Sequence, residues 1–321
     1  MIFSATGEIV SMHQEEHMQW ATTPGHSEHN PLEIWQKTQK CITGAMHKAS
    51  LTSNDIAAVG ITNQRETTVV WNKKTGQPYH NAIVWNDLRT TSICDKLAQQ
   101  PGGKERLREK TGLPLAPYFS ATKLMYLLDN VEGLRKDAEA GDALFGNIDT
   151  WLIWNLTGGR MHATDVTNAS RTLMMNLHTL QWDEGILSEL NIPNKMLPII
   201  KPSSGLFGHV AKGTSASLEG VPISGVLGDQ QAALFGQCCF DVGEAKCTYG
   251  TGAFLLMNTG DRPIHSNSGL LTTVAYQLGA EGKPVYALEG SVAYAGLLIQ
   301  WLRDNLQIIG SAREGQELAG G

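Results

Sequence analysis

The stretch GITNQRETTVVW, from Gly60 to Trp71, places an arginine and a glutamate side by side between two β-rich runs. Residues 56–62 form an apolar run bounded by polar residues, and residues 67–71 are rich in β-branched side chains. Both runs predict strands. Arg65 and Glu66 therefore follow a buried strand, and the carboxyl ends of strands are where ligands collect in open α/β sheets.

Strand-like and helical segments alternate along the rest of the chain, and no internal repeat interrupts this order. Strands are expected at residues 8–18, 82–85 and 222–227, and the strand at 82–85 is expected to neighbour those at 56–62 and 67–71. Helices are expected at residues 121–130 and 288–306. A further helix is expected to begin at Pro31, with Asn30 as its N-cap. The pattern at 149–156 fits either type. The segment CTYGTGAFLLMN, residues 247–258, predicts two strands folded at Gly250 and Gly252. This alternation indicates an α/β protein with a domain boundary near Gln237.

Composition excludes several classes of function. The chain has 321 residues, 41% of them hydrophobic, and a net charge of −6 without any block of basic residues, which argues against nucleic-acid binding. No apolar run approaches the roughly 20 residues that span a bilayer, so no membrane insertion is predicted. The five cysteines follow no C-x-x-C spacing and indicate neither a disulfide framework nor a zinc site. We expect a cytoplasmic protein.

The segment HQEEH, His13 to His17, matches a zinc-peptidase pattern that requires both histidines on one helical face. The flanking residues alternate as in a strand, where residues four apart are separated by roughly 13 Å, too far to share one metal ion. A solvated polar strand face is favoured.

Arg65 and Glu66 are chemically complementary. A guanidinium offers several donors in a rigid fork and a carboxylate offers only acceptors, so the pair suits adjacent hydroxyls that each donate and accept. A polyol fits this description. The alternative is a surface ion pair in a turn.

Two further segments suit phosphoryl transfer. In GDQQAALFGQ, Asp229 follows another buried strand and is either a general base or a helix cap. In YGTG, from Tyr249 to Gly252, backbone N–H groups and the Thr251 hydroxyl can face phosphate oxygens, although such glycines are also common in turns. No Walker A or G-x-G-x-x-G pattern follows a strand, so any phosphate chemistry uses another architecture.

Segments along nearly the whole chain follow one family pattern in order, among them GITNQRETTVVW, NAIVWNDLRT, TGLPLAPYFSATKL, DTWLIWNLTGG, GDQQAALFGQ and YGTGAFLLMNTG. The chain resembles the FGGY family of carbohydrate kinases, and within it the members that phosphorylate glycerol. The resemblance implies an α/β chain with the actin-like, ribonuclease-H-like ATPase fold. Residues 1–237 would form the glycerol-binding domain and residues 238–321 the start of the ATP-binding domain.

The resemblance also implies residue roles. Glycerol would be held by seven side chains: Arg65, Glu66, Trp85, Tyr118, Asp229, Gln230 and Phe254. The nucleotide would be contacted by Thr251, Gly296 and Gln300. Asp229 would be the general base that takes a proton from a terminal hydroxyl as it attacks the γ-phosphorus of ATP, giving sn-glycerol 3-phosphate with ATP and Mg²⁺ as cofactors. A homo-oligomer is implied for the full-length protein.

The chain departs from the family pattern at both ends. It begins at Met1, after the first strand and the phosphate-binding turn D-x-G-T-[TS]-S-x-R, and it ends soon after Gln300. We therefore expect a fragment that lacks this turn and most of the ATP-binding domain. A non-catalytic product is the alternative function, and another FGGY sugar kinase is a third. The adjacent Arg65 and Glu66 argue against the third because they belong to the glycerol-specific pattern.

Overall fold

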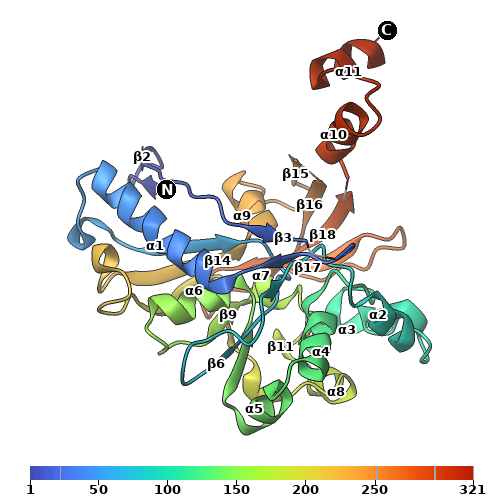
Figure 1. The fold of residues 1–321 in the computed structure, drawn as a ribbon, viewed down its shortest axis with the longest axis horizontal. Coiled ribbons are helices and arrows are strands. Elements are labelled where there is room, and N and C mark those ends of the chain that lie inside the picture. The colour runs from blue at the N-terminus through green and yellow to red at the C-terminus, as the bar shows by residue number, and fades with distance from the viewer. Residues whose placement is uncertain (22, 251, 293, 321) are drawn as a thin grey trace.

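The computed structural model describes residues 1–21, 23–250, 252–292 and 294–320 (Figure 1). At its centre, strand β14 (Pro222–Gly228) pairs in parallel with β5 (Val59–Asn63) and antiparallel with β13 (Ser204–His209). The register places Gly228 opposite Asn63, so β5 and β14 end at the same edge. Both runs are strands as predicted, and their parallel pairing brings the segments that follow them to one sheet edge.

A second, antiparallel sheet has the order β15-β16-β18-β17. Its strands are β15 (Ala245–Tyr249), β16 (Ala253–Gly260), β17 (Leu271–Gln277) and β18 (Pro284–Val292). The predicted pair of strands at residues 247–258 is therefore confirmed. Helix α9 (Asp229–Gly236) contacts both sheets, through β14 on one side and β15, β16 and β17 on the other (Figure 1). The segment that carries Asp229 is thus enclosed between two sheets.

The remaining elements surround these two sheets. The other α-helices of the described residues are α1 (Pro31–Lys48), α2 (Thr91–Leu97), α3 (Arg108–Thr111), α4 (Ser120–Asn130), α5 (Leu134–Ala140), α6 (Ile148–Leu156), α7 (Val166–Ala169), α8 (Glu184–Glu189), α10 (Gly296–Asp304) and α11 (Ala312–Ala319). The short strands pair as β1 (Ile2–Phe3) with β2 (Ile9–Ser11), β4 (Glu28–His29) with both β3 (Gln19–Trp20) and β7 (Ala82–Ile83), β6 (Val69–Asn72) with β8 (Ala143–Gly146), β9 (Ala163–Asp165) with β12 (Ile199–Lys201), and β10 (Met175–Asn176) with β11 (Gln181–Trp182).

Helix starts follow local chemistry as predicted. Helix α1 begins behind Asn30, whose side-chain oxygen accepts a hydrogen bond from Leu32 N at 2.9 Å, and Pro31 occupies the first helical position. Helix α4 covers the predicted segment 121–130. The ambiguous segment 149–156 is helical and is buried on most sides, which explains why its sequence shows no amphipathic period.

Three predictions of secondary structure are wrong. Residues 8–18 are not one strand, since only Ile9–Ser11 pairs and residues 12–18 have no regular structure. Residues 288–306 are not one helix, because β18 continues to Val292 and a helix begins only at Gly296. The backbone of β18 pairs with β16 on one side and β17 on the other, and these ladders outweigh the local pattern.

The runs at 56–62, 67–71 and 82–85 are also not neighbours in one sheet. Strand β5 pairs with β14, β6 with β8 and β7 with β4, and a single bridge between Thr68 and Ile83 links the second run to the third. The local sequence predicts the strands but carries no information on which distant strand completes each ladder.

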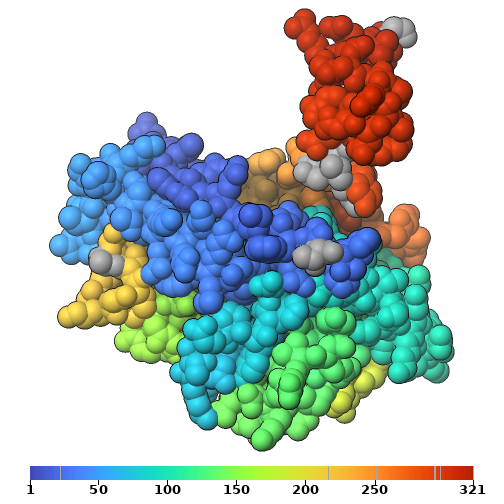
Figure 2. All heavy atoms as spheres, viewed as in Figure 1, coloured from blue at the N-terminus to red at the C-terminus, as the bar shows by residue number. Residues whose placement is uncertain are grey.

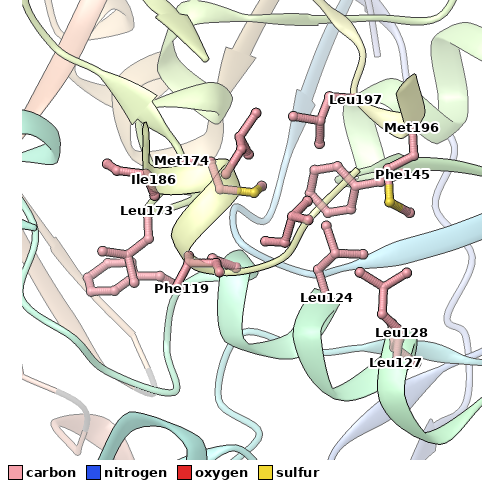
Figure 3. Close-up of a cluster of buried hydrophobic side chains, with 14 of the residues drawn as sticks. Phe119, Leu124, Leu127, Leu128, Phe145, Leu173, Met174, Ile186, Met196 and Leu197 are labelled. Carbon is pink, nitrogen blue, oxygen red and sulfur yellow. The ribbon is translucent and has the colours of Figure 1, made fainter. Parts of the chain in front are cut away.

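The largest apolar core of the described residues surrounds α4 and β8 (Figure 3). Its buried members include Phe119, Leu124, Phe145, Leu173 and Met174. Phe119 follows a predicted site residue directly, and Leu173 and Met174 lie just beyond Arg171. The core therefore anchors the two loops that reach the site.

The C-terminal helices stand apart from this body. Figure 2 shows the segment with α10 and α11 rising clear of the rest of the molecule beyond the end of β18. None of the helices in the described ranges combines the length and apolarity that a bilayer crossing requires.

The buried carboxyl of Asp149 gives the stability of the fold a pH dependence. Its side chain is 0% exposed, Oδ2 accepts from the Thr164 hydroxyl at 2.6 Å, and Oδ1 has no hydrogen-bond partner among the described residues. Burial raises the pKa of Asp149 from 3.8 to about 7. The folded state therefore retains a proton that the unfolded chain releases between these values.

We expect this contribution to stability to be fully present below about pH 4 and to be lost as the pH rises through about 7. The free energy of unfolding should fall by up to about 1.4 kcal/mol per pH unit in this window, and Asp149→Asn should remove that slope. Urea denaturation across the window measures it, with Asp95→Asn at an exposed position of α2 as the control. An unchanged slope in Asp149→Asn would contradict the assignment.

Candidate active site

The shared edge of β5 and β14 opens into a small cavity of about 60 Å³. Eight residues line it: Gln64, Arg65, Glu66, Trp85, Tyr118, Asp229, Gln230 and Phe254. All seven residues that the sequence assigned to the acceptor site are among them. The structure thus brings together residues from five separate stretches of the chain, while their binding role stays a prediction.

Four buried charges form a network at the floor of this cavity, with Arg65 and Glu66 in the lining and Arg171 and Glu289 behind them. Arg65 and Glu66 are each 2% exposed, and Arg171 and Glu289 are fully buried. Glu289 accepts hydrogen bonds from both guanidiniums, with Oε1 at 2.9 Å from Arg65 Nη2 and 3.0 Å from Arg171 Nη2. Arg171 Nε donates to Glu66 Oε1 at 2.6 Å. The alternative of a surface ion pair in a turn is therefore wrong.

The charges of this network balance. Burial alone would raise the pKa of Glu289, but Arg171 and Arg65 outweigh burial and lower it to about 2. Burial raises the pKa of Glu66 despite the attraction of Arg65 and Arg171. Two guanidiniums facing two carboxyls keep the floor close to neutral, which makes its burial tolerable.

A strained backbone brings Arg65 and Glu66 into the same network. Glu66 has φ of +60°, a left-handed conformation that is uncommon for residues other than glycine. Its carbonyl accepts hydrogen bonds from the Ser120 and Thr68 hydroxyls, each at 3.1 Å. Such strain concentrates at functional sites, where the surroundings enforce it.

An aromatic wall closes one side of the cavity. The ring of Trp85 lies 5.6 Å from that of Tyr118 and 6.1 Å from that of Phe254, in edge-to-face geometry. Tyr118 is held from behind by Lys123, whose ammonium donates to the carbonyls of Pro117, Tyr118 and Phe119. The wall offers an apolar surface beside a charged floor.

Asp229 is the exposed acid of the site. Its side chain is 43% exposed, and its Oδ1 lies 3.5 Å from Arg65 Nε. Gln230 binds the carboxylate twice, through its backbone N–H at 2.8 Å and its side-chain amide at 3.0 Å. The N-cap position of α9 belongs to Gly228, so Asp229 is the first helical residue and the helix-cap alternative is wrong. A carboxylate held in this way and facing a cavity is suited to accept a proton.

Comparison with known proteins fits this geometry. A family model described as the N-terminal domain of the FGGY family of carbohydrate kinases matches residues 1–236, and its C-terminal counterpart matches residues 245–319. The chain belongs to the FGGY family of carbohydrate kinases.

Two relatives that are more than half identical to this chain share the name glycerol kinase. Proteins named glycerol kinase from Paenarthrobacter aurescens and Beijerinckia indica are 59% and 58% identical to this chain, over 100% and 99% of its length. The chain spans 64% of the length of each. A crystal structure of Plasmodium falciparum glycerol kinase with ADP is 41% identical and superposes with a TM-score of 0.91, covering 98% of this chain and 62% of the other. The predicted actin-like, ribonuclease-H-like fold is confirmed.

Two of the three predicted nucleotide contacts are not part of the cavity lining. Gly296 and Gln300 belong to α10 and are absent from the residues that line the cavity, and Thr251 lies outside the described residues. Gly296 N donates to Gly250 O at 2.9 Å, so α10 begins beside the turn between β15 and β16. Their contact with a nucleotide stays a prediction.

The sequence did not indicate several residues in or behind the cavity. These are Gln64 in the cavity lining, and Arg171, Gln231, Lys246 and Glu289 behind it. Glu289 and Lys246 each occupy a buried position in a strand, where an unpaired charged side chain is rare. A charged residue within an otherwise apolar strand is the pattern that could have indicated them, but the sequence predicted a helix at residues 288–306 and placed the first strand of the pair only from residue 247.

Removing the shared carboxylate should destabilise the whole site. Glu289→Gln leaves the two buried guanidiniums with Glu66 as their one buried counter-charge and the half-exposed Asp229 beside Arg65, and we expect the free energy of unfolding to fall by about 3–5 kcal/mol. Urea denaturation measures this fall. The control Asp304→Asn removes an exposed ion-pair partner of Arg303 on α10 and should change little. Equal effects of the two variants would contradict the importance of the buried pair.

Gly228 should tolerate no side chain because Arg65 packs directly against it. A Cβ at residue 228 would lie 2.7 Å from Arg65 Cγ and 2.8 Å from Cδ. We expect Gly228→Ala to reduce the free energy of unfolding by about 1–3 kcal/mol through this overlap. The matched control is Gly225→Ala on the same strand, where a Cβ meets no atom within 4 Å. A larger loss in the control than in Gly228→Ala would overturn the packing argument.

Proposed function

We propose that this chain carries the acceptor site and catalytic carboxylate of a glycerol kinase, which transfers the γ-phosphate of ATP to glycerol and releases sn-glycerol 3-phosphate. One observation carries the proposal: a single small cavity joins a charged floor, an aromatic wall and a half-exposed carboxylate. The names of relatives that are 59% and 58% identical support it.

The size of the cavity favours glycerol over larger carbohydrates. The cavity measures about 60 Å³ and opens to solvent beside Asp229, so its walls enclose room for a small acceptor. Glycerol has six non-hydrogen atoms, whereas a five-carbon sugar has ten. The cavity therefore suits a triol.

The polar groups of the cavity are complementary to hydroxyls. Arg65 Nε lies 3.5 Å from Asp229 Oδ1 and 3.8 Å from Glu66 Oε1 and has no hydrogen bond to any described residue. A hydroxyl placed among these groups would accept from Nε and donate to a carboxylate. Trp85 and Phe254 would pack against the carbon edge of the polyol.

Asp229 would act as the general base. As its carboxylate takes the proton from a terminal hydroxyl of glycerol, the hydroxyl oxygen bonds to the γ-phosphorus of ATP. The bond from that phosphorus to the β–γ bridging oxygen breaks, and ADP leaves with this oxygen and its electron pair. Such base catalysis contributes about 10²- to 10⁴-fold to a rate. The buried floor would hold the acceptor in line for this attack.

The residues of this site would bind Mg²⁺ only together with a nucleotide. The described residues contain no group of three or more His, Cys, Asp or Glu side chains that would enclose a metal ion. Mg²⁺ commonly binds through one or two carboxylates together with substrate phosphates, and Asp229 is the half-exposed carboxylate available here. When bound with ATP, Mg²⁺ supplies neutralisation of the phosphate charge.

Two measurements on this chain test the proposal. Calorimetric titration should show one saturable site for glycerol, and a coupled assay should show glycerol-dependent release of ADP. Asp229→Asn should lower kcat by about 10²- to 10⁴-fold while the Kd for glycerol changes far less, because the amide keeps the shape but accepts no proton. Asp241→Asn, at an exposed position after α9, is the matched control.

The acceptor is tested by repeating the titration with xylulose and gluconate. Tighter binding of either sugar than of glycerol would overturn the assignment of glycerol. Absence of glycerol binding would contradict the proposed acceptor site. Undiminished turnover in Asp229→Asn would exclude Asp229 as the base.

A further inference from the structure

Lys246 is a buried cation behind the site. It lies on β15 and is 1% exposed. Its ammonium has three N–H groups and three acceptors: Gln230 Oε1, the Thr248 hydroxyl at 2.9 Å and the Phe254 carbonyl at 3.3 Å. Within the described ranges it forms no ion pair. A buried lysine bound only by neutral groups is unusual and indicates a specific role.

The bond to Gln230 determines how that side chain is oriented. Gln230 is 7% exposed, and its Oε1 accepts from Lys246 while its Nε2 donates to Asp229 Oδ2 at 3.0 Å. If the amide were flipped, its N–H groups would face the ammonium and its oxygen would face the carboxylate, and both contacts would be repulsive. The cation therefore selects the one orientation in which Gln230 binds Asp229.

We propose that Lys246 is a positioning residue that fixes the Gln230 amide and, through it, the Asp229 carboxylate that faces the cavity. The inference rests on the proposed function, since Asp229 is the base of that reaction. Lys246 itself does not line the cavity, so its effect on the reaction passes through Gln230.

The surroundings of Lys246 make its hydrogen bond to Gln230 sensitive to alkaline pH. Burial lowers the pKa of Lys246 to about 8, and the nearby Arg65 guanidinium lowers it further, whereas Glu289, Asp229 and the Cys247 thiol oppose this. Below about pH 8 the ammonium supplies all three hydrogen bonds. A neutral amine has two N–H groups for three acceptors, so the hold on Gln230 weakens as the pH rises through this value.

A double-mutant cycle on kcat tests whether Lys246 acts on Asp229 through Gln230, which we call the Lys246 relay. We expect Lys246→Met to lower kcat about 10- to 100-fold, the value of a hydrogen bond to a charged group. In a Gln230→Ala background the same substitution should have almost no further effect, because the link to Asp229 is already broken. Fully additive effects of the two substitutions would overturn the proposal.

A nuclear magnetic resonance titration of the unmodified chain needs neither turnover nor a variant that folds. The side-chain amide resonances of Gln230 should shift with a midpoint near pH 8, while those of the exposed Gln237 should not. In Lys246→Arg, where the charge does not titrate, the Gln230 shift should disappear. A Gln230 amide that does not respond to pH in the unmodified chain would overturn the proposal.

The magnetic resonance titration and the activity assay together distinguish this inference from the proposed function. A titrating Gln230 amide in a chain without glycerol binding or turnover would refute glycerol kinase chemistry and support the Lys246 relay. Glycerol turnover together with an unresponsive Gln230 amide would support the proposed function and refute the relay.

Discussion

The site depends on one interaction, the pairing of Glu289 with the buried guanidiniums of Arg65 and Arg171. Without Glu289, the two arginines would share Glu66 as their one buried counter-charge, and an uncompensated buried ion costs several kcal/mol. The pairing also joins two regions of the chain. Arg65 and Arg171 lie in the part that matches the N-terminal FGGY domain, and Glu289 lies in the part that matches the C-terminal domain. The acceptor cavity therefore requires both regions to be folded together.

This pairing changes how the site must recognise hydroxyls. The sequence suggested that the guanidinium fork of Arg65 would hold adjacent hydroxyls directly. In the structure both terminal nitrogens are bound by Glu289, and Nη1 also donates to Gln231 at 3.2 Å. The donor left to face the cavity is Nε, beside Asp229. Under the proposed function, recognition would therefore be shared between one arginine nitrogen and two carboxylates, with most of the fork serving to anchor the residue.

The sequence predicted those parts of the site that depend on local pattern. Arg65 and Asp229 each follow an apolar strand, and parallel pairing of β5 and β14 brings the two strand ends together. Helix starts such as Asn30 were predictable because a cap is a local feature. Glu289 was not, since its partner Arg65 lies 224 residues away and only the tertiary fold makes the pair. Its strand was taken for a helix for the same reason: the ladders on both sides come from distant segments.

The contrast between the back and the front of the cavity explains how a small site can serve proton transfer. Behind it, charges and amides are buried and hydrogen-bonded, from the Glu289 network on one side to Lys246 and Gln230 on the other. At the front, the Asp229 carboxylate stays 43% exposed. Preorganised groups of this kind need little rearrangement when charge moves, whereas water dipoles must reorient. Asp229 lies 3.5 Å from Arg65 Nε, whereas Lys246 reaches it only through the Gln230 amide. Under the proposed function, this indirect contact would hold the orientation of the base, and the side of the carboxylate that faces the cavity would remain open to the acceptor.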